Sequence, residues 1–141
     1  MAVELLKCAF IILLLYCSWS DLQTRRIPNC AVLLLLLCAI AQSLLTGIWL
    51  DWKVAAMALV VGFGVFLLGC FGAGDIKYFW ACMMAVPNQV DVLLVSTAFA
   101  GLVLALIYLA KFNFRPKNVG TLPYGVAISF GLFLCLTEAV I

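Results

Sequence analysis

The chain has 141 residues, of which 68% are hydrophobic and 10% charged, and its mean hydropathy is +1.28. Because so little polar surface cannot enclose a water-soluble core, the composition indicates an integral membrane protein. The net charge of +2 gives no indication of nucleic-acid binding, and the absence of histidine excludes Ser-His and Cys-His nucleophilic sites and histidine-ligated metal or haem.

The first apolar run predicts a helix over residues 5–20, with Asp21 at its end. No small-residue cleavage site follows this run, so we interpret it as a membrane helix and not as a secretory signal. A basic loop comes next, and Pro28 suits the first turn of a second helix over residues 29–45. A Thr-Gly pair ends that helix, and the two tryptophans of the connection over residues 49–53 fit the aromatic belt of a bilayer surface.

A third helix is predicted over residues 54–71, with glycines at which another helix can approach closely. The apolar segment that follows, residues 76–86, is too short to span a bilayer alone. Either a fourth helix starts inside the preceding glycine motif and extends into Pro87-Asn88, which we favour, or it is a partial helix and Asp75 lies below the membrane surface. The glycines of the third helix are Gly62, Gly64 and Gly69.

Two more apolar runs complete the chain. Residues 90–109 form the clearest span, and residues 126–140 form a last helix after a basic, proline-containing loop. We therefore predict an all-α, polytopic membrane protein with six transmembrane helices, forming a single domain over residues 1–141.

The lysines and arginines predict the orientation of these helices. If the helices alternate, three loops on one side carry six of the eight positive residues, and by the positive-inside rule these loops are cytoplasmic and both termini are outside. Asp21 and Asp75 then lie on the same, cytoplasmic, side. The six residues are Arg25, Arg26, Lys77, Lys111, Arg115 and Lys117.

The chemistry that we expect depends on Asp21 and Asp75. An ionisable residue at membrane depth normally faces a protein interior or a water-filled cavity, and it marks a functional site. Two carboxyl groups that lie close together share one proton. The ionised member takes a proton from water while the protonated member donates to a carbonyl oxygen, as in an aspartic protease, which needs neither metal nor cofactor.

A simpler interpretation stays open, in which Asp21 caps a helix end and Asp75 pairs with Lys77, Arg25 or Arg26. The two glycines just before Asp75, Gly72 and Gly74, favour a site, because they let a backbone or a bound peptide approach the carboxylate. The seven cysteines form no Cys-x-x-Cys pair and lie mostly inside apolar runs, so we predict neither a metal site nor a disulfide framework.

Three motifs resemble those of the type IV prepilin peptidases. Residues 21–29 read Asp-Leu-Gln-Thr-Arg-Arg-Ile-Pro-Asn, which is similar to the family's first catalytic motif. Residues 72–77 read Gly-Ala-Gly-Asp-Ile-Lys, which resembles its Gly-x-Gly-Asp-x-Lys motif, and residues 122–125 read Leu-Pro-Tyr-Gly, which is similar to a Pro-(Phe/Tyr)-Gly element near the last helix. The motifs occur in family order and cover nearly the whole chain with the helices between them.

The resemblance implies a membrane aspartic endopeptidase that cuts pilin-like precursors after a glycine, on the cytoplasmic side of the cell (inner) membrane, and so removes their basic leader. Its partners would be the precursor, the lipid bilayer and components of a pilus or secretion assembly. By this resemblance Asp21 and Asp75 are the catalytic pair. Residues that would shape the site or bind substrate are Arg26, Pro28, Asn29, Gly72, Gly74, Lys77, Pro123, Tyr124 and Gly125, although an interfacial tyrosine is more often a belt anchor.

The chain departs from the long members of that family. It lacks their large cytoplasmic insertion with paired Cys-x-x-Cys motifs between the first two helices, so the N-methylation that many of them perform is not expected. It resembles instead the compact members that serve tight-adherence (Flp-type) pili.

Two other functions compete with this interpretation. An intramembrane protease of presenilin type usually has Tyr-Asp at the first aspartate and Pro-Ala-Leu near the last helix, whereas this chain has Ser-Asp and Pro-Tyr-Gly. A small transporter or pilus-assembly scaffold that uses the two acids to bind protons or a cation is the non-enzymatic alternative.

Overall fold

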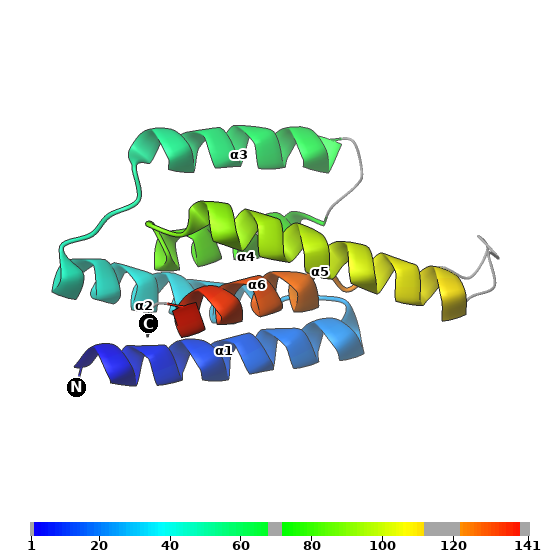
Figure 1. Ribbon diagram of the computed structural model, residues 1–141, viewed down its shortest axis with the longest axis horizontal. Coiled ribbons are helices and arrows are strands. Elements are labelled where there is room, and N and C mark those ends of the chain that lie inside the picture. Colours follow the sequence, from blue (N-terminus) through cyan, green and yellow to red (C-terminus); the bar gives the residue numbers. More distant parts are fainter. Residues whose placement is uncertain (1, 68–71, 112–121, 139–141) are drawn as a thin grey trace.

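The computed structural model describes residues 2–67, 72–111 and 122–138, and within these ranges the chain forms six α-helices and no strand (Figure 1). The all-α class is therefore confirmed for this part of the chain. The helices are α1 (Ala2–Thr24), α2 (Asn29–Thr46), α3 (Trp52–Leu67), α4 (Ala73–Ala85), α5 (Val90–Lys111) and α6 (Tyr124–Glu138).

Successive helices run antiparallel, so α1 begins and α6 ends at the same end of the bundle (Figure 1). The opposite end gathers the C-terminal end of α1 and the N-terminal ends of α4 and α6. Because Asp21 lies near the end of α1 and Asp75 near the start of α4, this topology brings the two carboxylates to one end of the molecule.

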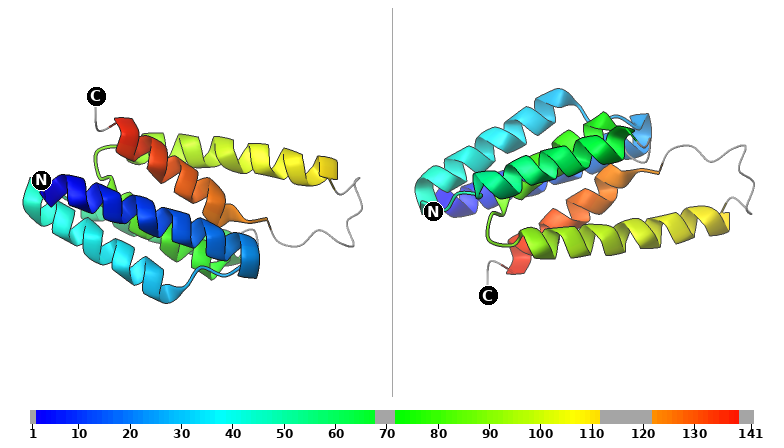
Figure 2. Two further views of the ribbon diagram at one scale, coloured as in Figure 1. Left: turned by 90° about the horizontal axis from the view of Figure 1, so that it is seen from below. Right: turned by 90° about the horizontal axis from the view of Figure 1, so that it is seen from above.

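The helices pack around a core that α1, α2, α4 and α6 share. The helix α4 packs on α2 and also contacts α6, while α1 contacts both α2 and α6. The remaining helices are peripheral: α5 packs on α6, α3 packs on α4, and α2 and α5 lie on opposite sides of the bundle (Figure 2). No described residue of α3 is buried. Side chains that are fully buried in the core include Phe10, Leu35, Tyr78, Leu132 and Cys135.

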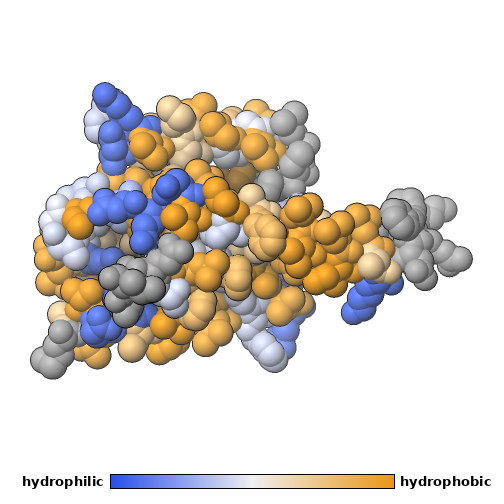
Figure 3. Space-filling model, viewed as in Figure 1, coloured by the Kyte–Doolittle hydropathy of each residue, from blue (hydrophilic) through white to orange (hydrophobic). Residues whose placement is uncertain are grey.

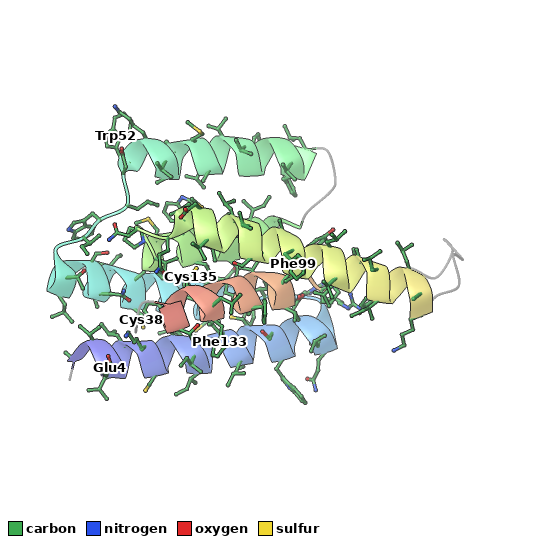
Figure 4. All side chains as sticks on the ribbon, in the orientation of Figure 1. Glu4, Cys38, Trp52, Phe99, Phe133 and Cys135 are labelled. Atoms are coloured by element: carbon green, nitrogen blue, oxygen red, sulfur yellow. The ribbon has the colours of Figure 1, made fainter. Side chains whose placement is uncertain are left out.

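The outer surface is apolar over the middle of the bundle, and hydrophilic residues gather towards its two ends (Figure 3). Leu44 and Val60 are 69% and 73% exposed, and Trp52 points away from the start of α3 (Figure 4). Large apolar side chains outside a bundle are unfavourable in water and favourable in lipid, so the surface agrees with a membrane protein.

By length and composition, three of the described helices can cross a membrane, namely α1, α2 and α5. The apolar helices α3 and α6 are shorter, and α4 has 13 residues. At about 1.5 Å per residue α4 is about 20 Å long, against a hydrocarbon layer of about 30 Å. Six helices are therefore present in the described part, but three of them fall short of the length expected of a span.

Several predicted helix ends are corrected by the structure. The first helix continues to Thr24, so Asp21 lies in its last turn and not after it. The third helix begins at Trp52, so the connection before it is shorter than predicted, and the last helix begins at Tyr124 instead of residue 126. Each of these ends was placed at a change from polar to apolar residues, whereas a helix continues as long as its backbone hydrogen bonds do.

The other helix predictions hold more closely. The helix over residues 29–45 ends one residue later, at Thr46, where Gly47 adopts a left-handed φ of 72° and its N–H donates to Ser43 O at 2.8 Å. Pro28 is its N-cap and stands just outside the predicted first turn. The clearest predicted span is α5, which starts at residue 90 and ends two residues late.

The fourth helix starts inside the glycine motif, at Ala73, as we favoured. It ends at Ala85 and does not extend into the Pro-Asn pair, so this part of the prediction is wrong. Close packing at Gly62 is confirmed, since a Cβ there would lie 2.8 Å from Ile76 Cγ2 of α4. Gly64 has no such neighbour, and the predicted residues 68–71 of the third helix, Gly69 among them, lie outside the described residues.

Candidate active site

Asp21 is buried although it is charged, with 4% of its surface exposed. Its Oδ2 accepts a hydrogen bond of 2.9 Å from the backbone N–H of Gly125. This amide belongs to the first turn of α6, where N–H groups have no partner within the helix. The carboxylate therefore occupies an anion site at a helix N-terminus, where hydrogen bonds and the helix dipole favour negative charge.

Gly125 is required here by the close approach of the carboxylate. A Cβ at this position would lie 2.7 Å from Asp21 Oδ2, 3.0 Å from its Cγ and 3.1 Å from Ile27 Cδ1. Any larger residue would displace either the carboxylate or the start of α6. The Pro-Tyr-Gly element thus contributes to the site through a backbone amide and the absence of a side chain.

Asp75 lies in the first turn of α4 and is partly buried. Its Oδ2 accepts a hydrogen bond of 3.3 Å from the N–H of Gly72, the residue that caps the same helix. This contact is the carboxylate half of a capping box, formed within four residues of the chain. Burial and the negative charge of Asp21 together raise the pKa of Asp75 to about 6, while the hydrogen bond from Gly72 acts to lower it. The helix that carries Asp75, α4, is not among the candidate membrane spans.

The two carboxylates face the same cavity at this end of the bundle. The cavity has a volume of about 230 Å³ and is lined by residues from α1, from the loop after it, from α4 and from the segment just before α6. That volume holds several water molecules, at about 30 Å³ each, but is below the range of about 300–1,000 Å³ that is usual for ligand pockets. The lining residues are Asp21, Arg25, Arg26, Ile27, Gly74, Asp75 and Leu122.

The predicted site residues separate into two groups. Asp21, Asp75, Arg26 and Gly74 line the cavity. Gly72 and Gly125 lie behind it, each donating a backbone N–H to one of the two carboxylates. The other predicted site residues do not line the cavity: Pro28, Asn29, Lys77, Pro123 and Tyr124.

The ion pair of the simpler interpretation is absent where the structure describes both partners. No salt bridge joins Asp75 to Lys77, whose side chain is exposed. Asp21 does cap a helix, but that helix is α6 and lies more than 100 residues along the chain from Asp21. Among the described residues, no three His, Cys, Asp or Glu side chains gather as metal ligands.

Arg25 is a lining residue that the sequence analysis did not assign to the site. It ends α1 with a left-handed φ of 54°, and its Nη2 donates to the hydroxyl of Tyr108 at 2.7 Å. The guanidinium also lies 5.4 Å from the centre of the Tyr108 ring and interacts electrostatically with Asp21. This cation therefore links the end of α1 to α5 beside the cavity.

Comparison with known families bears on this site directly. A model of the type IV leader peptidase family matches residues 8–109, nearly three quarters of the chain. The chain belongs to this family. The matched residues include Asp21, Asp75 and both of their motifs, and they end before the Pro-Tyr-Gly element. No curated protein and no solved structure was found to match the chain.

Family membership confirms the resemblance that the motifs indicated, and it implies a peptidase. With three apolar helices of spanning length, this member of the leader peptidase family is a membrane protein.

Proposed function

We propose that this protein is an aspartic endopeptidase of the cytoplasmic membrane that removes the short basic leader of pilin-like precursors by cutting after a glycine. The observation that carries the proposal is the cavity that Asp21 of α1 and Asp75 of α4 line together. It is found in a chain of the type IV leader peptidase family. The two carboxyl groups are the catalytic residues, and water is the nucleophile.

The two aspartates have different roles in this mechanism because their surroundings differ. Asp21 accepts a hydrogen bond from the N–H of Gly125 at the start of α6, which favours its ionised form, so in this mechanism it acts as the general base that takes a proton from water. Asp75, with its raised pKa, retains a proton that it donates to the oxygen of the scissile carbonyl. The water oxygen bonds to the carbonyl carbon and gives a tetrahedral intermediate. As its C–N bond breaks and the carbonyl re-forms, one hydroxyl proton returns to Asp75 and the proton held by Asp21 passes to the leaving amine.

The substrate lies across the mouth of the cavity, because the cavity has room for water but not for a peptide. An extended segment with a glycine at the cut suits this arrangement, since a side chain there would have to enter a space already lined by Ile27 and Leu122. Arg26, Pro28, Asn29, Lys77 and the Pro-Tyr-Gly element act as supporting residues around the pair.

For the membrane topology we propose one domain over residues 1–141, with six helices embedded in the bilayer and the catalytic end facing the cytoplasm. The positive charges at this end of the bundle support the orientation, since Arg25 and Arg26 line the cavity with the carboxylates and Lys111 lies in the last turn of α5, which ends on the same side (Figure 1). Both termini then face outward. The absence of a long insertion after α1 supports a compact peptidase of tight-adherence pili without methyltransferase activity.

The test is cleavage of a co-expressed pilin-like precursor by the wild type and by Asp21→Asn and Asp75→Asn, with the membrane level of each variant measured by blot. Each change keeps the side-chain shape and removes one proton-transfer group, so cleavage is expected to fall roughly 10²–10⁴-fold.

Asp91→Asn is the matched control, because Asp91 is exposed and lies in the first turn of α5 at the other end of the bundle. This variant is expected to cleave at the wild-type rate. If Asp21→Asn or Asp75→Asn also cleaves at that rate, the two-carboxylate mechanism is wrong and the transporter or scaffold function becomes the better account.

A further inference from the structure

A buried polar contact between α4 and α6 lies about one helical turn further along each helix than the candidate site. The hydroxyl of Tyr78 on α4 and Oγ of Ser129 on α6 are 2.7 Å apart. Tyr78 is fully buried, and Ser129 is 6% exposed. Tyr78 follows Asp75 by three residues and Ser129 follows Gly125 by four, so the contact and the site lie on the same faces of their helices.

The direction of the hydrogen bonds follows from the partners of Ser129. Its hydroxyl donates to the backbone carbonyl of Gly125 at 2.7 Å, and the carbonyl of Leu14 on α1 lies at 3.5 Å. Because a serine hydroxyl has one proton, Ser129 accepts from Tyr78 when it donates to Gly125. A chain of hydrogen bonds thus runs from Tyr78 through Ser129 to Gly125, whose own N–H donates to Asp21.

This chain connects helices that otherwise share few contacts near the site. The helix α4, which carries Asp75, packs mainly on α2, and its contact with α6 is smaller. The Ser129 hydroxyl that Tyr78 contacts also lies 3.5 Å from the Leu14 carbonyl on α1. This buried pair of hydroxyls therefore joins α4 to both helices that hold Asp21, namely α1 and α6.

A phenylalanine at position 78 and an alanine at position 129 would fill most of the same space without placing polar atoms among apolar ones. Polar groups in such surroundings are favourable only when they keep their hydrogen bonds, so the pair tolerates few relative positions of α4 and α6. Apolar contacts, by contrast, have no donor and acceptor directions to satisfy.

We propose that Tyr78 and Ser129 are positioning residues that fix the separation of the Asp21 and Asp75 carboxyl groups by locking α4 against α6. This inference rests on the proposed function of the two aspartates. Neither residue touches the cavity, so neither takes part in proton transfer.

The experiment measures kcat and KM of the purified full-length enzyme in detergent, on a peptide that spans the leader and the start of a pilin-like precursor. The variants are Tyr78→Phe, Ser129→Ala and the double variant. Rates are expressed per folded enzyme, from a thermal unfolding curve of each preparation. We expect kcat to fall roughly tenfold to a hundredfold, as for small displacements of reacting groups, with KM within about twofold of the wild type.

The double variant is expected to be no slower than the slower single variant, because both changes break one connection. Tyr16→Phe and Ser96→Ala serve as matched controls. Tyr16 is exposed on α1, and the Ser96 hydroxyl bonds to carbonyls of its own helix, so both controls should keep the wild-type kcat.

The outcomes separate this inference from the proposed function. An active wild type with inactive Asp21→Asn, but with Tyr78→Phe and Ser129→Ala at wild-type kcat, overturns the positioning role and leaves the peptidase mechanism intact. Additive losses in the double variant, or a rise in KM at constant kcat, also overturn it. An Asp21→Asn variant that is as active as the wild type refutes the proposed function itself.

Discussion

Replacing Gly125 by alanine tests how far the position of the Asp21 carboxylate controls the reaction. The added Cβ would lie 2.7 Å from Oδ2, whereas ordinary van der Waals contact begins at 3.4 Å. The carboxylate, or the first turn of α6, must therefore move by about 0.7 Å. Retreat of the side chain is hindered because Asp21 is buried, and the new methyl group would also lie only 3.1 Å from Ile27 Cδ1.

Two effects set the magnitude of the loss. Weakening a hydrogen bond to a charged group costs about 1.5–3 kcal/mol, and displacing a catalytic group by about 1 Å lowers rates by up to about 10²-fold. We therefore expect Gly125→Ala to lower kcat roughly 10- to 100-fold. The helix itself does not suffer, because alanine is the better helix former by about 1 kcal/mol.

The assay is single-turnover cleavage of the precursor peptide, with thermal unfolding of the same preparations. Gly101→Ala is the matched control, since its added Cβ meets only Tyr124 Cε1, at the ordinary distance of 3.8 Å. Cleavage by Gly125→Ala at the rate of Gly101→Ala would refute the view that the start of α6 holds Asp21 in place.

Two further predictions concern pH and helix packing. The proposed acid, Asp75, works in its protonated form and has a pKa of about 6. The kcat should therefore fall as the pH rises through 6, with a slope that approaches tenfold per pH unit. A kcat that is constant between pH 5 and 8 contradicts that role. Gly62→Ala introduces a Cβ 2.8 Å from Ile76 Cγ2 and should destabilise the enzyme by about 1–3 kcal/mol, visible as a lower melting temperature. Ile76→Ala, which removes the clashing Cγ2, should recover part of that loss in the double variant, and additive losses would show that the two side chains do not meet.

The sequence predicts the helices of this fold because apolar runs and polar breaks alternate strongly along it. The spans over residues 29–45 and 90–109 are found within two residues of their predicted ends. The last residue of α4 is less predictable, because Pro87 prevents the helix from continuing past it but does not determine at which earlier residue the helical hydrogen bonds stop. The extension of α1 to Thr24 has the same cause, since polar residues continue a helix as readily as apolar ones do.

The candidate site is predictable in part. Asp21 and Asp75 are recognisable because charges are rare in this chain and each stands in a distinctive motif. Arg25 was assigned only to topology and to a salt bridge with Asp75, because nothing local indicates that it reaches Tyr108, 83 residues away. Tyr78 and Ser129 had one signal, which is a hydroxyl one turn after a motif residue inside an otherwise apolar helix.

The two aspartates are held by different kinds of contact, and the proposed mechanism depends on this difference. Asp75 is bonded to Gly72 within its own helix turn, so its position is set as soon as α4 forms. Asp21 is bonded to Gly125 across the fold, so its position and its charge depend on the docking of α6 against α1. Two chemically identical side chains thereby become unlike, one favoured as an anion by a helix N-terminus and the other favoured as an acid by burial beside that anion. A change that loosens α6 should therefore lower activity before it unfolds the bundle, because the proposed base, Asp21, loses its hydrogen bond from Gly125 while the proposed acid, Asp75, keeps the one from Gly72.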